Sequence, residues 1–554
     1  MDWHFDNTYV RELPWLGAAM QPIAVAQPRI IYVGEQLAHE LRLDPAWLAS
    51  EAGAQVVAGS AVPEGAEPIS QAYAGHQFGY FSPRLGDGRA HLLGEVVDVE
   101  GRRRDIALKG SGRTVFSRGG DGRAAIGPIL REVLVSEAMA AIGVRTTRAL
   151  AAAETGEHVW RDGRPERGAV LMRVADSHLR VGTLELVRTQ GSREQLAALV
   201  DYSRRRHYPE IGADDVWGLF DAIAERQAEL IAHWMSLGFI HGVMNTDNMA
   251  LSGETIDYGP CAFLDHYAPE TVYSSIDTGG RYRYSAQPTI AGWNLARLAE
   301  SLLPLAVEPG LTEAPDEVVE EATTRVGDFE DRYAAAFRRR MAAKLGLPTD
   351  IEDDTADVLI AGLLRVMERE SLDFTGTFRT LAKTLRGETP AEGAAGPDPG
   401  RTKTFLLSRS GTAEKEPGEP VAGGESGSGR TRTFLLSRSG TAEKKPGETG
   451  ADSESAAQGT ALAEWVEGWQ AALLRVGADP EETAQRMDEV NPAYIPRNHL
   501  VEEALDAARE GDLMPFEELL EVLRHPFEER PEWSRYAEPA PERFTATYVT
   551  FCGT

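Results

Sequence analysis

Four side chains suited to acid–base or metal chemistry lie close together in the sequence. His241, Asp247 and Asn248 belong to the segment HGVMNTDN, and Asp257 opens an Asp-Tyr-Gly triplet nine residues after Asn248. Carboxylate and amide oxygens are ligands that Mg²⁺ prefers. Asp247 is the only carboxylate of the first segment, so it is a candidate general base. The alternative is that Asp247 and Asn248 only form an Asx turn after a helix.

The spacing of these residues is typical of the protein-kinase catalytic loop, H-R-D-x-x-x-x-N, which is followed by a metal-binding D-F-G triplet. Asn248 lies seven residues after His241, as in that loop, and Asp-Tyr-Gly takes the place of D-F-G. Val243 stands where the kinase base would be. The pattern therefore predicts two metal ligands, Asn248 and Asp257, without the standard base.

Lys109 is the only lysine among the first 343 residues, although the chain has 57 Lys+Arg. Codon bias explains a general scarcity of lysine, but a compact ammonium at this one position suggests a specific need. Lys109 ends a predicted strand, where a kinase lysine binds nucleotide phosphates and pairs with a glutamate of the next helix. Glu132 fits that role, and Glu137 is the alternative. An exposed lysine at a strand end is the other interpretation.

Turns rich in glycine and arginine surround Lys109 on both sides. They are Gly86-Asp87-Gly88-Arg89, Gly110-Ser111-Gly112-Arg113 and Gly119-Gly120-Asp121-Gly122-Arg123. Glycine lets backbone N–H groups approach a phosphate, and arginine adds a fork of donors. Each turn taken alone is more often a plain connection than a phosphate site.

Arg173 and Arg180 are two further candidate phosphate ligands, seven residues apart. Arg173 interrupts the apolar run 169–174, where a cation without an anion is costly. The alternative is a structural ion pair with a neighbour such as Asp176.

The elements that must position these residues follow from periodicity and turn signals. Segments 90–97 and 105–109 predict an antiparallel hairpin, and 169–174 predicts a buried strand. A helix is expected to begin near Pro128 and to end at Gly143. Apolar residues at helical spacing predict further helices over 219–234 and 293–303.

The fold class predicted from this order is α+β, with a small strand-rich lobe before a larger helical lobe. We expect an N-terminal extension over 1–70, the strand-rich lobe over 71–180 and the helical lobe over 181–386. Residues 387–456 are rich in Gly, Pro, Glu, Ser and Thr, and the unit 401–415 recurs at 430–444. That composition predicts a disordered duplicated insertion. A C-terminal helical segment over 457–554 ends in a tail that carries Cys552.

Composition excludes several classes of protein. The chain has 554 residues, more than one core usually fills, and a net charge of −29. A pI near 4.9 argues against nucleic acid as a partner. No apolar run is long enough to span a membrane, and the first residues do not resemble a signal peptide, so we expect a cytoplasmic protein without a membrane anchor. The only cysteines, Cys261 and Cys552, fit a reducing compartment, and a redox contact between them stays open.

Several longer strings resemble the selenoprotein O family. The matching strings include ALKGSG at 107–112, GDGRA at 120–124, TTRAL at 146–150, HGVMNTDNM at 241–249 and DYGP at 257–260. The similarity is dense over about 65–300 and extends to NPAYIPRN at 491–498 and to the Cys552 tail. The duplicated insertion is not part of the pattern of that family.

The resemblance implies a protein-kinase-like bilobal fold whose nucleotide binds in a flipped orientation. AMP from ATP would then be transferred to Ser, Thr or Tyr hydroxyls of protein substrates, with Mg²⁺ or Mn²⁺ as the metal and the protein acting as a monomer. The implied nucleotide ligands are Lys109, Arg173, Arg180, Gly86, Gly88, Arg89, Asp121 and Gly122. Asn248 and Asp257 would hold the metal, Asp247 would be the base, and Glu132 would orient Lys109.

Two other functions remain open at the level of sequence. One is ordinary transfer of the γ-phosphate of ATP, as in protein kinases. The other is a non-catalytic pseudokinase that binds a nucleotide and holds partner proteins together, with the duplicated insertion as a candidate docking segment.

Overall fold

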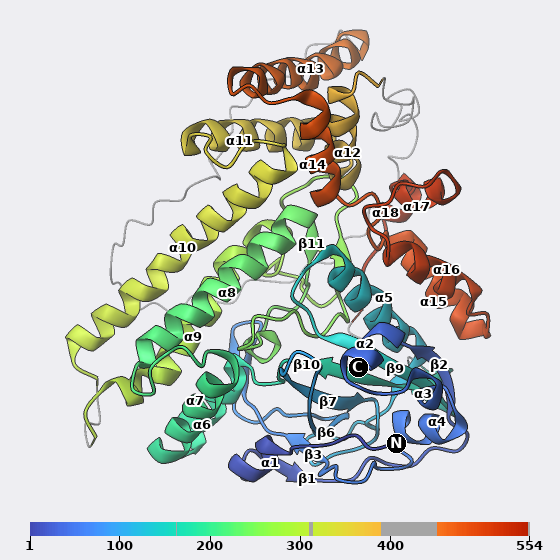
Figure 1. Ribbon diagram of the computed structural model, residues 1–554, viewed down its shortest axis with the longest axis vertical. Helices are drawn as coiled ribbons and strands as arrows, with labels where there is room; N and C mark the ends of the chain where they lie inside the picture. The colour runs from blue at the N-terminus through green and yellow to red at the C-terminus, as the bar shows by residue number, and fades with distance from the viewer. Residues whose placement is uncertain (162, 310–313, 389–450, 552–554) are drawn as a thin grey trace, which may run out of the picture.

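An antiparallel sheet with helices on both faces forms one half of the molecule, and a set of long helices forms the other (Figure 1). The computed structural model describes residues 1–161, 163–309, 314–388 and 451–551. Most of the expected insertion, together with Cys552, lies outside the described residues. Over the described ranges the fold is α+β, as the sequence predicts.

The sheet contains eight strands within the described residues. In spatial order they are β1 (Gly17–Ala19), β3 (Ile69–Gln71), β6 (Ala90–Val97), β7 (Arg103–Lys109), β10 (Arg164–Ala175), β9 (Arg148–Arg161) and β2 (Arg29–Val33), with β8 (Ala124–Ala125) paired to β10. The predicted hairpin is β6 and β7, which pair in antiparallel register with Ala90 opposite Lys109. Because β1 and β2 are strands of this sheet, residues of the expected N-terminal extension complete it.

Strand alternation separates the two faces of the sheet. Ile106 and Leu108 of β7 and Met172 of β10 face one side, where they pack with the N-terminal helices. These helices are α2 (Glu35–Glu40), α3 (Pro45–Leu48) and α4 (Glu51–Val57). Leu171, the residue before Met172, therefore faces the other side of the sheet, toward α5 (Ile126–Ile142).

Helix α5 lies between the sheet and two C-terminal helices, α15 (Asn498–Glu510) and α16 (Met514–Leu523). Leu130 and Val133 of α5 share a buried cluster with Val501 and Phe516. Helix α5 begins two residues before Pro128, and it ends at Gly143, whose φ of 93° is the left-handed cap that glycine favours. The end of the chain thus holds α5 against the sheet.

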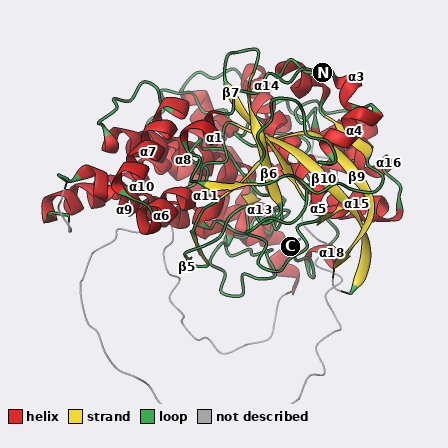
Figure 2. Ribbon diagram, turned by 90° about the horizontal axis from the view of Figure 1, so that it is seen from below, coloured by secondary structure: helices red, strands yellow, loops and turns green. Residues whose placement is uncertain are grey.

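The helical half begins directly after β10. Its helices are α6 (Val181–Gln190), α7 (Arg193–His207), α8 (Val216–Leu237), α9 (Gln287–Ala306), α10 (Asp316–Lys344), α11 (Asp353–Glu370) and α12 (Phe374–Leu385). Helices α8 and α9 contain the two predicted helical segments. Figure 2 shows α6 to α10 on one side of the molecule and strand β9 with α5 and α15 on the other.

The remaining elements are short or C-terminal. They are α1 (Thr8–Glu12), β4 (Gly75–Gln77), β5 (Tyr80–Ser82), β11 (Phe239–Ile240), β12 (Ala262–Phe263), α13 (Ala451–Arg475), α14 (Pro480–Val490), α17 (Ser534–Ala537) and α18 (Glu542–Thr545). Gly511, with a φ of 101°, separates α15 from α16 within the predicted C-terminal helical segment. In the described residues no helix combines the length and the apolar character needed to cross a membrane.

Candidate functional site

Lys109, Glu132 and Asp257 meet at the edge of the sheet that faces the helical half. Lys109 at the end of β7 contacts Glu132 Oε1 of α5, and its Nζ lies 2.9 Å from Asp257 Oδ1. Glu132 Oε1 also accepts a hydrogen bond from the backbone N–H of Tyr258 (3.0 Å). The carboxylate of Glu132 therefore positions both the lysine and the segment that carries Asp257. The expected pairing of Lys109 with Glu132 is present.

Asp257 is held in a conformation and a charge state that suit a ligand for cations. Its φ of 71° lies in the left-handed region, which is uncommon for residues other than glycine. Burial by itself raises the pKa of Asp257, but the charge and the hydrogen bond of Lys109 hold it well below the usual range. The carboxylate stays ionised at all ordinary pH values. Lys109 contacts Oδ1 of this carboxylate.

The loop that carries Asp247 and Asn248 is a short 3₁₀ turn, Thr246–Asn248. His241 anchors the start of this loop: its Nε2 donates to the carbonyl oxygen of Ile256 (3.0 Å), and its Nδ1 accepts from the N–H of Val243. Asn248 Nδ2 donates to the carbonyl oxygen of Val243 (3.1 Å), which fixes the orientation of the amide. The loop is thereby tied to Ile256, the residue before Asp257.

Asp247 is buried, and one of its oxygens has no partner among the described residues. Oδ2 accepts a hydrogen bond from Gln77 Nε2 (3.1 Å), whereas the buried Oδ1 accepts none. A Cβ added to Gly75 would lie 2.9 Å from Oδ1, so glycine leaves room beside the carboxylate. Burial raises the pKa of Asp247 to about 6, although Arg180 and Gln77 act in the opposite direction. Such a carboxylate is able to take up a proton near neutral pH.

Arg180 lies beside Asp247 and also has an unsatisfied group. Its Nη1 donates to the backbone carbonyl of Asp247 (3.1 Å), and its Nε donates to the carbonyl of His178 (3.0 Å). Its Nη2 is buried without a hydrogen-bond partner within the described residues, and lies 4.0 Å from an oxygen of Asp87. Buried donors in folded proteins are rarely left unpaired. Arg180 Nη2 and Asp247 Oδ1 are thus two groups that a ligand would satisfy.

Arg173 is held by a buried chain of polar contacts. Its Nε donates to His178 Nε2 (3.2 Å), and His178 Nδ1 donates to Asp105 Oδ2 (2.9 Å). Asp105 in turn is paired with Arg206 of α7. Arg173 Nη1 also lies 3.8 Å from Glu132 Oε2. The expected alternative partner, Asp176, instead pairs with Arg104 and Arg145.

The glycine-rich turns lie near the same edge of the sheet, and their glycines pack against different neighbours. Gly86 has a φ of 125°, and a Cβ there would lie 2.5 Å from the ring of Phe116. Gly122, with a φ of 69°, packs against the backbone of Gly112 in the turn after β7. Gly88 of the first turn lies against the backbone of Phe116. Backbone of both turns therefore adopts shapes that require glycine.

Charged residues of the same turns differ in where their side chains lie. The charge of Arg89 helps to lower the pKa of Asp257. Both carboxylate oxygens of Asp121 bond to Arg161, and one also accepts from the N–H of Arg123. Any contribution of Asp121 to a ligand would therefore involve its backbone or a rearranged side chain.

The structure decides the alternative assignment of Glu137, whereas the redox contact between Cys261 and Cys552 stays a prediction. Glu137 does not pair with Lys109: its carboxylate binds Arg148 (2.9 and 2.8 Å) and the N–H of Ala149. Cys261 is fully buried, its Sγ donates to the carbonyl of Tyr258, and burial raises the pKa of its thiol to about 12. Cys552 lies outside the described residues.

Several residues around the site were not anticipated from the sequence. Gln77 and Gly75 of β4 lie against Asp247, and His76 of the same strand bonds to Glu185 of α6 (2.5 Å). Glu185 Oε2 accepts from Thr246 Oγ1, next to Asp247. The string AGHQFG at 74–79 contains the polar and glycine residues involved, but its link to residue 247 exists only in the folded chain.

The oxygens at the site suit a divalent cation that is shared with phosphates. Within the described residues, Asn248 Oδ1 accepts no hydrogen bond and no group of three His, Cys, Asp or Glu side chains is arranged to hold a metal. Mg²⁺ commonly uses one or two protein oxygens together with substrate phosphates and water. Asn248 and Asp257 match that mode of binding.

Comparison with known proteins gives the class to which this fold and site belong. A family model described as Protein adenylyltransferase SelO matches residues 7–524. The Protein nucleotidyltransferase YdiU of Mycobacterium sp. (strain KMS) is 45% identical over 551 residues, which are 99% of each chain. The protein of the same name from Rhodopseudomonas palustris (strain BisB5) is 47% identical over 556 residues, again 99% of each chain.

A third relative of that name, from Cereibacter sphaeroides (strain ATCC 17029 / ATH 2.4.9), is 45% identical over 556 residues and all of both chains. The site and these matches define a nucleotidyltransferase that acts on proteins. More narrowly, the chain belongs to the SelO family of protein adenylyltransferases.

Proposed function

We propose that the protein transfers AMP from ATP to Ser, Thr or Tyr hydroxyls of other proteins and releases pyrophosphate. The observation that carries this proposal is that cationic side chains and carboxylate oxygens from distant segments of the chain meet at one site. Lys109 contacts Asp257, and Arg180 contacts the loop of Asp247. The unpaired Arg180 Nη2 and Asp247 Oδ1 are donor and acceptor that a nucleotide and a hydroxyl would complete.

Each residue has a role in this proposal. Lys109, Arg173 and Arg180 neutralise the triphosphate, and Glu132 orients Lys109. The nucleotide pocket is completed by Gly86, Gly88, Arg89, Asp121 and Gly122. Mg²⁺ or Mn²⁺ held by Asn248 and Asp257 supplies charge neutralisation at the phosphates.

The reaction has one nucleophile and one leaving group. The hydroxyl oxygen of the substrate protein forms a bond to the α-phosphorus, and the bond from that phosphorus to the β-phosphate oxygen breaks. Pyrophosphate leaves with the electron pair, and the hydroxyl proton passes to Asp247. A pKa of about 6 leaves this carboxylate mostly ionised at neutral pH, as a base requires.

The architecture we propose is that of a protein kinase with two lobes. The strand-rich lobe over 71–180 supplies Lys109 and Glu132, and the helical lobe over 181–386 supplies Asp247, Asn248 and Asp257. The succession of a strand lysine, a helix glutamate and a later Asn/Asp pair supports this proposal. In this proposal residues 1–70 and the C-terminal helical segment pack on this unit, and the duplicated segment within 387–456 is an insertion into it.

The test compares ATP labelled at the α-phosphate with ATP labelled at the γ-phosphate, each incubated with the protein, Mg²⁺ or Mn²⁺ and a cell extract. We expect protein-bound label from the α position only, and its loss with Asp257→Asn. Label from the γ position only would establish kinase activity instead. Intact-mass measurement of a labelled substrate separates an added AMP from an added phosphate.

A further inference from the structure

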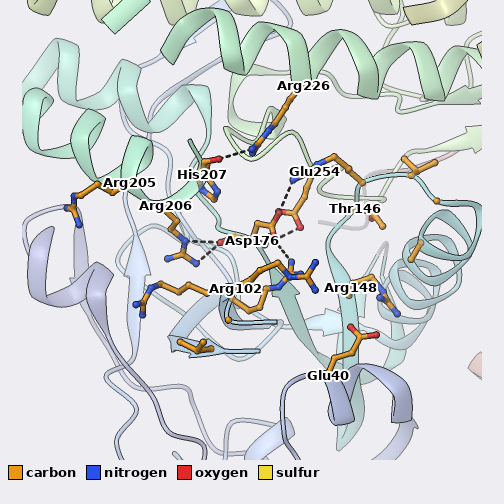
Figure 3. Close-up of a pocket in the computed structure, with 18 residues that line it drawn as sticks. Glu40, Arg102, Thr146, Arg148, Asp176, Arg205, Arg206, His207, Arg226 and Glu254 are labelled. Atoms are coloured by element: carbon orange, nitrogen blue, oxygen red, sulfur yellow. Dashed lines mark hydrogen bonds and ion pairs between the residues drawn. The ribbon is translucent and has the colours of Figure 1, made fainter. Parts of the chain in front are cut away.

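A cavity of about 760 Å³ lies between the sheet and helices α7 and α8 (Figure 3). Its walls come from the start of β7, the turn after α5, the end of α7 and the middle of α8. Lys109 ends β7, whereas Arg103 and Arg104 at the start of that strand line the cavity. None of the residues that we assign to the nucleotide site lines it. The cavity is therefore separate from that site.

The wall of this cavity is rich in arginine although the whole chain has a net charge of −29. Eight arginines line it, against three carboxylates, Glu40, Asp176 and Glu254. Burial, together with the charge of Asp176, raises the pKa of Glu254 to about 8. Carboxylates behind the wall neutralise some of the arginines, as Glu137 does for Arg148.

Arg226 lines the cavity and has no carboxylate partner within the described residues. Its guanidinium lies 4.0 Å above the ring of Tyr208, and its Nη2 donates to the carbonyl oxygen of His207 (2.7 Å). Figure 3 shows Arg226 reaching from α8 toward His207 at the cavity. A half-buried guanidinium that meets only a carbonyl and a ring lacks the anion that normally offsets its burial.

Arg145 and Arg104 add further donors from the sheet side. Arg145 uses only Nη2, which contacts Asp176 and the carbonyl of Ser252. Arg104 uses Nε and Nη1, which contact Asp98 and Asp176. In the described residues the other guanidinium nitrogens of both arginines make no hydrogen bond. Donors from two walls are therefore available to one anion in the cavity.

We propose that this cavity binds a small polyphosphate anion, recognised through its phosphates by Arg104, Arg145 and Arg226. Guanidinium forks match phosphate oxygens, and several arginines together favour an anion with more than one phosphate. No Phe, Tyr or Trp of the described residues lines the cavity, so an aromatic stack for a base is absent and the phosphates carry the recognition.

The test is calorimetric titration of the full chain with inorganic tripolyphosphate at about 0.15 M salt, where weak surface attraction is screened. Arg145→Gln with Arg226→Gln should weaken binding roughly tenfold or more, because each glutamine keeps a donor but removes a charge. Arg29→Gln with Arg535→Gln is the matched control, since both arginines are more than half exposed and lie outside the cavity. The control should bind as the unaltered chain does.

Lys109→Ala distinguishes this cavity from the nucleotide site, and it should retain tripolyphosphate binding. Binding that is lost with Lys109→Ala and kept by the double arginine variant would overturn the proposal, as would no binding by the unaltered chain. If the double variant does not fold, Arg102→Gln at the half-exposed rim replaces it, with the same expected direction. In the Lys109→Ala protein, ATP should displace tripolyphosphate and adenosine should not, whereas displacement by adenosine would contradict recognition through phosphates.

Discussion

Asp247→Asn is expected to abolish transfer and at the same time to stabilise the folded chain. The side chain is buried, Gln77 is its only side-chain hydrogen-bond donor among the described residues, and Oδ1 is unpaired. Asparagine keeps the shape and can still accept the hydrogen bond from Gln77, but it carries no charge. The substitution removes a proton acceptor that the reaction needs and a charge that the fold disfavours.

The size of the stabilisation follows from the pKa of Asp247. The folded value of about 6, against about 4 for an ordinary aspartate, corresponds to about 3 kcal/mol above pH 7. Between about pH 4 and pH 6 the folded chain keeps a proton that the unfolded chain has lost, so the stability of the unaltered protein falls as pH rises through this window. The gain from Asp247→Asn is therefore about 3 kcal/mol at neutral pH and about half of that near pH 5.

Urea unfolding at these two pH values measures the gain, with Asp328→Asn on the exposed face of α10 as the matched control. The control should change the free energy of unfolding by less than about 0.5 kcal/mol at both pH values. The initial rate of AMP transfer by the unaltered protein should rise with pH through about 6. A variant that is less stable than the unaltered chain at neutral pH, or that keeps full transfer activity, would refute the assignment of Asp247.

Three further predictions concern single ionisable side chains. Lys109→Met should lower the rate of AMP transfer by about a hundredfold or more. The control Lys383→Met, at the surface pair with Glu529, should keep full activity. Equal transfer rates for the two variants would remove Lys109 from the site. Burial lowers the pKa of Lys344 to about 7, so the stability of the folded chain should rise with pH from there to about 10. Lys344→Met should therefore add about 4 kcal/mol near pH 7 and little near pH 10. A gain that is independent of pH in urea unfolding would contradict this. Burial raises the pKa of the Cys261 thiol to about 12. A Cys552→Ser chain should therefore resist iodoacetamide when folded and gain one adduct in urea. An adduct on the folded chain, measured by intact mass, would disprove the burial.

Local pattern was sufficient for the elements that carry the site. Alternation along 90–97 and 105–109 predicted the hairpin, and Gly143 marked the end of the helix that bears Glu132. The pairing of Lys109 with Glu132 followed from their places on a strand and the next helix. These features depend on side-chain periodicity and on backbone preferences over a few residues. Both can be recognised in the local sequence.

The charge states and the support of the site were decided by the tertiary structure. Glu137 lies on the same helix as Glu132, yet it binds Arg148, because the rotation of α5 is set by packing against β9 and α15. The raised pKa of Asp247 results from burial beneath β4, about 170 residues earlier in the chain. The sequence by itself determined which elements form and which residues have the chemistry. Burial, unpaired groups and the arginine cavity arise from contacts between distant segments, whose free energies no local pattern encodes.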